Sequence, residues 1–146
     1  MDSSNGFAVV DPDVVTAKIA TIDRCLRRIE DTRGARRQVL LPIEVEDVVV
    51  LNLQRAVQAT IDLAAHVVTT GETGLPDSVA EFFTLLGRSG VIDTELAARL
   101  RKMVGFRNIA VHQYEALDPQ ILESIVTRHL DDLRAFSAIV ANKLGL

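Results

Sequence analysis

Residues 42–68 read PIEVEDVVVLNLQRAVQATIDLAAHVV, and this stretch decides the fold class. Its apolar side chains recur every three to four residues, as on one face of an α-helix, at Val45, Val48, Val49, Leu53, Val57, Ile61, Ala64 and Val68. The β-branched run at residues 48–50 favours a strand when taken alone, but the helical period continues on both sides of it. We therefore expect one long helix that begins at Pro42 and is ended by Gly71 and Gly74.

Start and stop signals on either side of this segment predict helices near both ends of the chain. Asp11 and Asp118 each precede a proline, so that a capping carboxylate stands before a residue suited to the first helical position, Pro12 or Pro119. The helix that begins at Pro12 is expected to end near Gly34. From Pro119 the apolar pattern predicts one helix that continues almost to the end of the chain.

Two more helices are predicted between these segments. Ser78 and Glu81 have the spacing of a capping box, which would open a short helix that ends near residues 87–90. Asp93 is a capping residue for the next helix. The chain is therefore expected to be all-α, as a five-helix, mostly antiparallel bundle. Because its second and fifth helices are apolar around more than one face, we also expect a homodimer.

Length and composition fit one globular domain. The chain has 146 residues, with 16 Lys and Arg against 20 Asp and Glu, and a net charge of −4. We expect a flexible leader at residues 1–11 and a single helical domain at residues 12–146. The acidic balance excludes a broadly basic surface for wrapping nucleic acid, and the single cysteine, Cys25, excludes an internal disulfide. With neither a signal peptide nor a membrane span in the sequence, the cytoplasm is the expected compartment.

Neither a metal site nor a bound cofactor is predicted. The three histidines lack the spacing of a metal site, and the glycines form no phosphate-binding loop. Asp62 and His66 lie four residues apart, on one face of the long helix. Two interpretations stay open for them: a carboxylate that orients an imidazole, or a local pair of structural importance only.

An arginine-rich stretch lies at residues 24–37, with six arginines against Glu30 and Asp31. A solvated helix end explains it, because cations also suit the negative end of the helix dipole. A contact with RNA phosphates or with an acidic partner explains it equally well.

The densest group of polar side chains is GFRNIAVHQY at residues 105–114, near the end of the fourth predicted helix. On a regular helix Asn108 and His112 lie one turn apart, and Arg107 and Tyr114 share a face. Arg107 and His112 are about 140° apart around the helix. They meet over one substrate only if Arg107 reaches around, the helix bends, or a second chain contributes.

These residue types suit the cleavage of RNA without a metal ion. A histidine can take the proton of the 2′-hydroxyl or protonate the leaving oxygen, and an arginine can hold the phosphate as charge builds on it. Asn108 can hold the imidazole or a phosphate oxygen. A solvated polar patch at a helix end is the plainer interpretation of the same spacing.

Arg107-x4-His112-x-Tyr114 resembles the R-x4-H-x-Y motif of the HepT-like toxin family of the HEPN superfamily. The segment AVQATIDLAAH at residues 56–66 is similar to another pattern of that family. The resemblance implies a helical homodimer that acts as a metal-independent endoribonuclease, with RNA as substrate. It also implies a cognate minimal nucleotidyltransferase (MNT) as antitoxin, which transfers AMP onto the motif tyrosine.

Carried over to this sequence, the resemblance makes Arg107 and His112 catalytic and Asn108 a supporting residue. Tyr114 becomes the AMP acceptor, and Asp62 and His66 become candidates for a supporting role beside the site. Two other functions stay open: a HEPN module that binds a nucleotide or protein without catalysis, and an antidote to a toxic nucleotidyltransferase.

Overall fold

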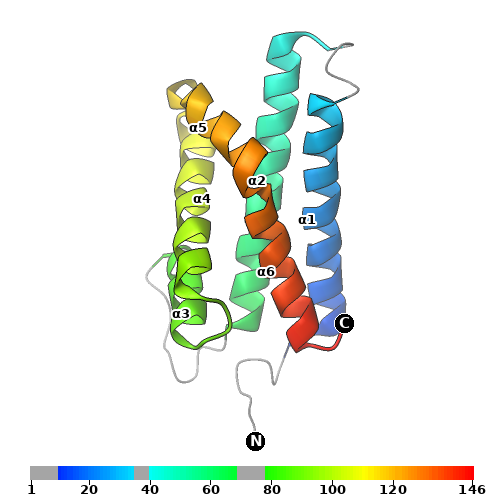
Figure 1. The fold of residues 1–146 in the computed structure, drawn as a ribbon, viewed down its shortest axis with the longest axis vertical. Coiled ribbons are helices and arrows are strands. Elements are labelled where there is room, and N and C mark those ends of the chain that lie inside the picture. Colours follow the sequence, from blue (N-terminus) through cyan, green and yellow to red (C-terminus); the bar gives the residue numbers. More distant parts are fainter. Residues whose placement is uncertain (1–9, 35–39, 69–77) are drawn as a thin grey trace, which may run out of the picture.

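The computed structural model describes residues 10–34, 40–68 and 78–146. Its helices are α1 (Pro12–Arg33), α2 (Pro42–Val67), α3 (Glu81–Arg88), α4 (Thr94–His112), α5 (Pro119–Ser124) and α6 (Leu130–Lys143), with a π-helical segment (Ile125–His129) between the last two. In Figure 1, α1 and α4 run in one direction, while α2 and α6 run in the other. The predicted all-α, five-helix bundle is confirmed for the described residues, with α5, the π segment and α6 counted as one interrupted helix.

Side-chain caps confirm three of the predicted helix starts. The carboxylates of Asp11, Asp93 and Asp118 each accept a hydrogen bond, at 2.7–2.9 Å, from a backbone N–H two or three residues further along. These bonds satisfy N–H groups that have no partner within the helix. At the other end of α1, Gly34 follows the last helical residue, as predicted.

The predicted capping box of α3 is wrong. The helix begins at Glu81, one residue after Ala80, and the Ser78 side chain does not cap it. Instead, the carbonyl oxygens of residues 78–80 accept from the N–H groups three residues ahead, at 3.1–3.3 Å. Because this tight backbone turn already supplies acceptors to the first N–H groups, no capping side chain is needed.

The predicted end of the long helix is also wrong. The last helical residue of α2 is Val67, and Val68 is already extended, with φ −84° and ψ 122°. The helix therefore ends before Gly71 and Gly74, which lie outside the described residues.

The last helix is interrupted, where the sequence pattern predicted a regular one. Ile125 and Leu130 are both buried although they lie five residues apart. In an α-helix that spacing turns the second side chain about 140° away from the first. The wider π turn at residues 125–129 brings both side chains onto the side that faces the core.

Aliphatic side chains fill most of the core, and one aromatic pair joins α3 to α6. The rings of Phe83 and Phe136 meet edge to face, with centroids 5.6 Å apart.

None of the described helices is long and apolar enough to cross a membrane. Of the predicted leader, residues 1–9 lie outside the described part of the chain. Asp11 is described, and its N–H donates to Nε2 of His66 on α2 at 3.0 Å.

Candidate active site

The polar motif lies at the C-terminal end of α4. The helix stays regular through His112 and ends there, because the next residue, Gln113, leaves the helical conformation with φ −143° and ψ 57°. Tyr114 therefore lies in the following 3₁₀ turn, Tyr114–Ala116. The prediction that Arg107 and Tyr114 share one helix face is wrong, since the helix does not reach the tyrosine.

Arg107 is held in place by two amide oxygens. Its Nη1 donates to Oδ1 of Asn108 at 2.9 Å, and its Nη2 donates to Oε1 of Gln58 on α2. The side chain is half-buried. Both acceptors are neutral, so they fix the guanidinium plane without cancelling its charge. The charge of Arg107 therefore stays available for a phosphate.

Gln58 is oriented by a second set of bonds. Its Nε2 donates to Oδ1 of Asp62 at 2.8 Å, and Nζ of Lys18 on α1 donates to Oδ2 of the same carboxylate at 3.1 Å. A carboxylate only accepts hydrogen bonds, so the NH₂ end of the amide faces Asp62 and the oxygen faces Arg107. A continuous polar chain thus runs from α1 through α2 to Arg107.

Asp62 and His66 bond to different partners. Asp62 orients Gln58, whereas Nε2 of His66 accepts from the backbone N–H of Asp11. The interpretation of Asp62 as the group that orients His66 is therefore wrong. His66 lies one turn further from Gln58 than Asp62 does, beside the start of α1, and it carries no proton on Nε2 in this arrangement.

Asn108 and His112 lie on the exposed side of the helix end, one turn apart. The Oδ1 of Asn108 accepts from Arg107, and among the described residues Asn108 forms no hydrogen bond with the His112 imidazole. Arg107 turns toward α2, while His112 lies about 140° around the helix from it. The two side chains are therefore presented in different directions by one copy of α4.

Tyr114 also bonds to α2. Its hydroxyl donates to Oδ1 of Asp47 at 2.6 Å, and the residue is 40% exposed. Burial raises the pKa of Tyr114 above its usual value, and the hydrogen bond to Asp47 and the negative charges of Asp47 and Glu46 raise that pKa further. Asp47 and Gln58 lie three turns apart on one face of α2, about 16 Å along the helix. This face therefore contacts both ends of the motif.

Three residues that contact the motif or extend its polar chain were missed as site residues in the sequence: Lys18, Asp47 and Gln58. A signal existed for Gln58, because Gln58 and Asp62 are polar residues at i and i+4 in a helix that is otherwise rich in apolar side chains. Asp47 and Lys18 carry no such signal, since their partners are 67 and 44 residues away.

No group of three or more His, Cys, Asp or Glu side chains suited to holding a metal ion occurs within residues 10–34, 40–68 and 78–146.

The fold and the site define a class of protein: a helical bundle in which one helix ends in an Arg-x4-His-x-Tyr motif held by polar side chains of a neighbouring helix. The chain matches the model of the ribonuclease HepT-like family over residues 22–140. It is 41% identical to the mRNA nuclease HepT of Shewanella oneidensis over 128 residues, which cover 88% of this chain and 96% of the relative. The chain belongs to the HepT-like family.

Other relatives agree with this assignment. The tRNA nuclease HepT of Aphanizomenon flos-aquae is 26% identical over 75% of this chain and 76% of its own length. A solved structure of the tri-AMPylated Shewanella oneidensis HEPN toxin in complex with its MNT antitoxin superposes with a TM-score of 0.82, at 39% identity, over 90% of this chain and 99% of that one. A toxin–antitoxin structure with AMP-PNP gives a TM-score of 0.81 at 39% identity, over 89% and 98% of the two chains.

Proposed function

We propose that this chain is an endoribonuclease toxin that acts in the cytoplasm, cuts RNA without a metal ion and is neutralised by a nucleotidyltransferase partner. The observation that carries the proposal is Arg107, held with its charge unneutralised at the end of the helix that presents His112. Family membership adds support, because two relatives are named RNA nucleases, and a solved structure similar to this chain is a toxin in complex with an MNT antitoxin.

The chemistry uses the 2′-hydroxyl of RNA as the nucleophile. His112 takes the proton of this hydroxyl, or returns a proton to the leaving 5′-oxygen, while the 2′-oxygen bonds to phosphorus. The bond from phosphorus to the 5′-oxygen breaks, which leaves a 2′,3′-cyclic phosphate on one product and a 5′-hydroxyl on the other. Arg107 binds the phosphate oxygens on which negative charge grows. Asn108 and Gln58 support the reaction by holding Arg107.

The active form is a homodimer in this proposal. Arg107 and His112 of one chain face different directions, so a second copy supplies the missing partner across a shared cleft. Apolar side chains that suit such an interface are exposed beside the motif, on the facing helices α2 and α4: Leu51, Ile109 and Val111, at 41–46% exposure. A pair of motifs around one cleft would also explain how an acidic protein binds RNA, since the positive charge is needed near the cleft and not over the whole surface.

The nucleotidyltransferase neutralises the toxin by transferring AMP from ATP to the hydroxyl of Tyr114: the tyrosine oxygen bonds to the α-phosphorus, the bond to the β-phosphate breaks, and pyrophosphate and the phenolic proton leave. The tyrosine lies at the end of α4, two residues past His112, and is partly exposed. An added nucleotide brings bulk and negative charge next to the cleft, where it repels RNA. The Tyr114→Phe variant should gain no mass from AMP when incubated with ATP and the partner, and it should stay toxic in cells that also express the partner.

The test of the RNA chemistry uses the nucleophile itself. Mass-verified, unmodified protein should cut an RNA in excess chelator, and replacement of the 2′-hydroxyl by hydrogen at the cut site should stop cleavage there. Cleavage of the deoxy substrate at the same bond, or loss of cleavage in chelator, would contradict the mechanism. Growth arrest when the partner alone is expressed, with none from this chain, would instead identify this chain as an antidote.

A further inference from the structure

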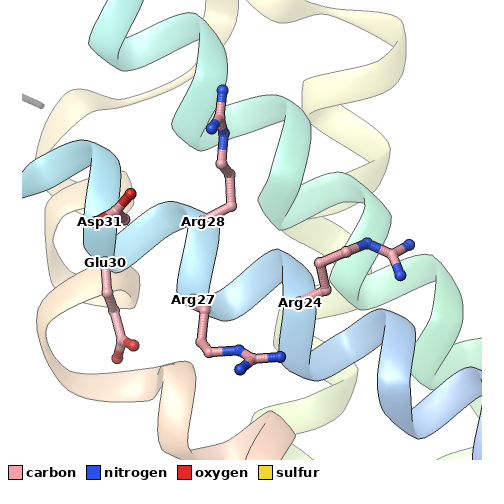
Figure 2. A pocket seen from close by; sticks show the side chains of 5 residues that line it. All are labelled: Arg24, Arg27, Arg28, Glu30 and Asp31. Carbon is pink, nitrogen blue, oxygen red and sulfur yellow. The ribbon is translucent and has the colours of Figure 1, made fainter.

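Four arginines of the arginine-rich stretch lie in the described residues, and they differ in their partners. Arg33 donates to both carboxylate oxygens of Glu123, at 2.7 and 2.9 Å, and so ties α1 to α5. Arg27 pairs with Asp23 on its own helix at 3.0 Å. Arg24, by contrast, forms no ion pair with any described residue. Figure 2 shows its side chain extending toward α2, whereas that of Arg27 points away from α2.

Arg24 lines a hollow of about 340 Å³ between α1 and α2. The residues that line it include the charged or polar side chains of Lys18, Arg24, Arg55, Gln58 and Asp62 and the thiol of Cys25. Lys18 and Asp62 pair with each other, so their charges cancel. Arg55, like Arg24, has no ion pair within the described residues, and two uncompensated positive charges remain in the hollow.

Arg24, Arg55 and the buried Cys25 line the same hollow. Burial raises the pKa of the Cys25 thiol, and the positive charges of Arg24 and Arg55 both oppose that rise. Two like charges that face one hollow repel each other, and an anion bound between them removes the repulsion. The hollow is therefore suited to a group with negative charge.

The hollow borders the candidate active site at Gln58. This residue lines the hollow and also holds Arg107. Arg55 lies one turn before Gln58 on α2, about 4.5 Å along the helix axis. An RNA strand with one phosphate at Arg107 would thus have a neighbouring phosphate near Arg55 and Arg24 if it continued from the motif into the hollow. The guanidinium fork of arginine matches the oxygens of a phosphate.

We propose that the hollow between α1 and α2 is a second phosphate-binding subsite for the RNA substrate, in which Arg24 and Arg55 hold a backbone phosphate beside the one that is cut. This inference rests on the proposed function, and it assigns part of the arginine-rich stretch to RNA binding.

Binding of a substrate that cannot react tests the subsite. A ten-nucleotide 2′-O-methyl RNA keeps the phosphates and withholds the nucleophile. The Arg24→Gln/Arg55→Gln variant should bind it on the order of tenfold more weakly than the parent, and the plot of log affinity against log salt should lose about 1.4 in slope, since each phosphate contact to a single strand contributes about 0.7. The control variant Arg27→Gln/Lys143→Gln removes the same charge outside the hollow and should match the parent. Equal affinity and slope in both variants would overturn the proposal.

Cleavage separates this proposal from the proposed function. In the Arg24→Gln/Arg55→Gln variant, kcat/KM should fall more for a ten-nucleotide RNA than for a dinucleotide. The ratio of kcat/KM for the long RNA to kcat/KM for the dinucleotide should therefore be lower than in the parent. If the parent cuts RNA and this ratio does not change, the subsite is wrong while the ribonuclease stands. If the parent cuts no RNA but the double variant binds RNA more weakly, the proposed ribonuclease function is wrong, and the proposal of a phosphate-binding site in the hollow is supported. Normal RNA binding by a folded double variant that no longer binds the nucleotidyltransferase would identify the hollow as a protein-docking surface and overturn the proposal.

Discussion

The end of α4 and the face of α2 beside it contribute to the candidate site in different ways. The α4 segment carries Arg107 and His112, the residues proposed to touch RNA, within six consecutive positions. On α2, Asp47, Gln58 and Asp62 lie on one face over about four turns. Asp47 bonds to Tyr114, Gln58 bonds to Arg107, and Asp62 orients Gln58. The chemistry is therefore local in sequence, while its geometry depends on a helix that lies about 50 residues earlier in the chain.

Among the residues that join α4 to α2, the largest effect on cleavage is expected for Arg107→Lys. Lysine keeps the positive charge but has no planar fork, so it cannot bond to Asn108 and Gln58 while it also holds a phosphate. We expect kcat/KM for RNA to fall by about 10²–10³. Single-turnover cleavage of a labelled RNA measures this loss, and activity within threefold of the parent would show that charge alone is sufficient.

A smaller loss is expected when α2 no longer holds the arginine. Gln58→Leu removes the acceptor of Nη2 and should lower the cleavage rate on the order of tenfold, because Arg107 becomes mobile. Gln54→Leu makes the same chemical change one turn earlier on α2 and serves as the control. A positioning role predicts that the Gln58→Leu loss falls on kcat more than on KM. Equal rates for the two variants would remove Gln58 from the site.

A still smaller loss is expected for Asp62→Asn. The asparagine can donate as well as accept, so it no longer dictates which end of the Gln58 amide faces Arg107. The expected decrease in kcat is about threefold, as only a fraction of molecules keep the productive amide orientation. His66→Asn, one turn further from Gln58, is the comparison and should have the weaker effect. A larger decrease in kcat for His66→Asn than for Asp62→Asn would contradict the claim that Asp62 orients Gln58 toward Arg107.

The least effect on cleavage is expected at Asp47, whose influence falls on Tyr114. Asp47→Asn removes a negative charge that raises the pKa of the tyrosine, so the pKa should fall toward its usual value near 10. The chain has one tyrosine and no tryptophan, so the phenolate absorbance reports on Tyr114 alone. In the parent, the phenolate should form only at higher pH than in the variant. Identical titration curves would show that Asp47 does not bond to Tyr114 in solution.

Much of the fold was predictable because its signals are local. Aspartate caps, prolines at first helical positions and the apolar period are each written within a few residues, and they placed α1, α2 and α4. The errors came where tertiary packing or backbone geometry decides, as at the π segment, which keeps Ile125 and Leu130 against the core. In the site, Arg107 and His112 stand out by residue type and spacing. The bond from Gln58 to Arg107 depends on how α2 packs against α4, which no short motif encodes.

The central claim is that the end of α4 cuts RNA through His112. Its most direct test is the cleavage of RNA in chelator by unmodified parent protein and by His112→Ala, with analysis of the product ends. The account predicts that the parent leaves 2′,3′-cyclic phosphate ends and that the variant, still folded and dimeric, cuts at least about 10²-fold more slowly. Equal rates for the two proteins, or products with 3′-hydroxyl ends, would contradict it.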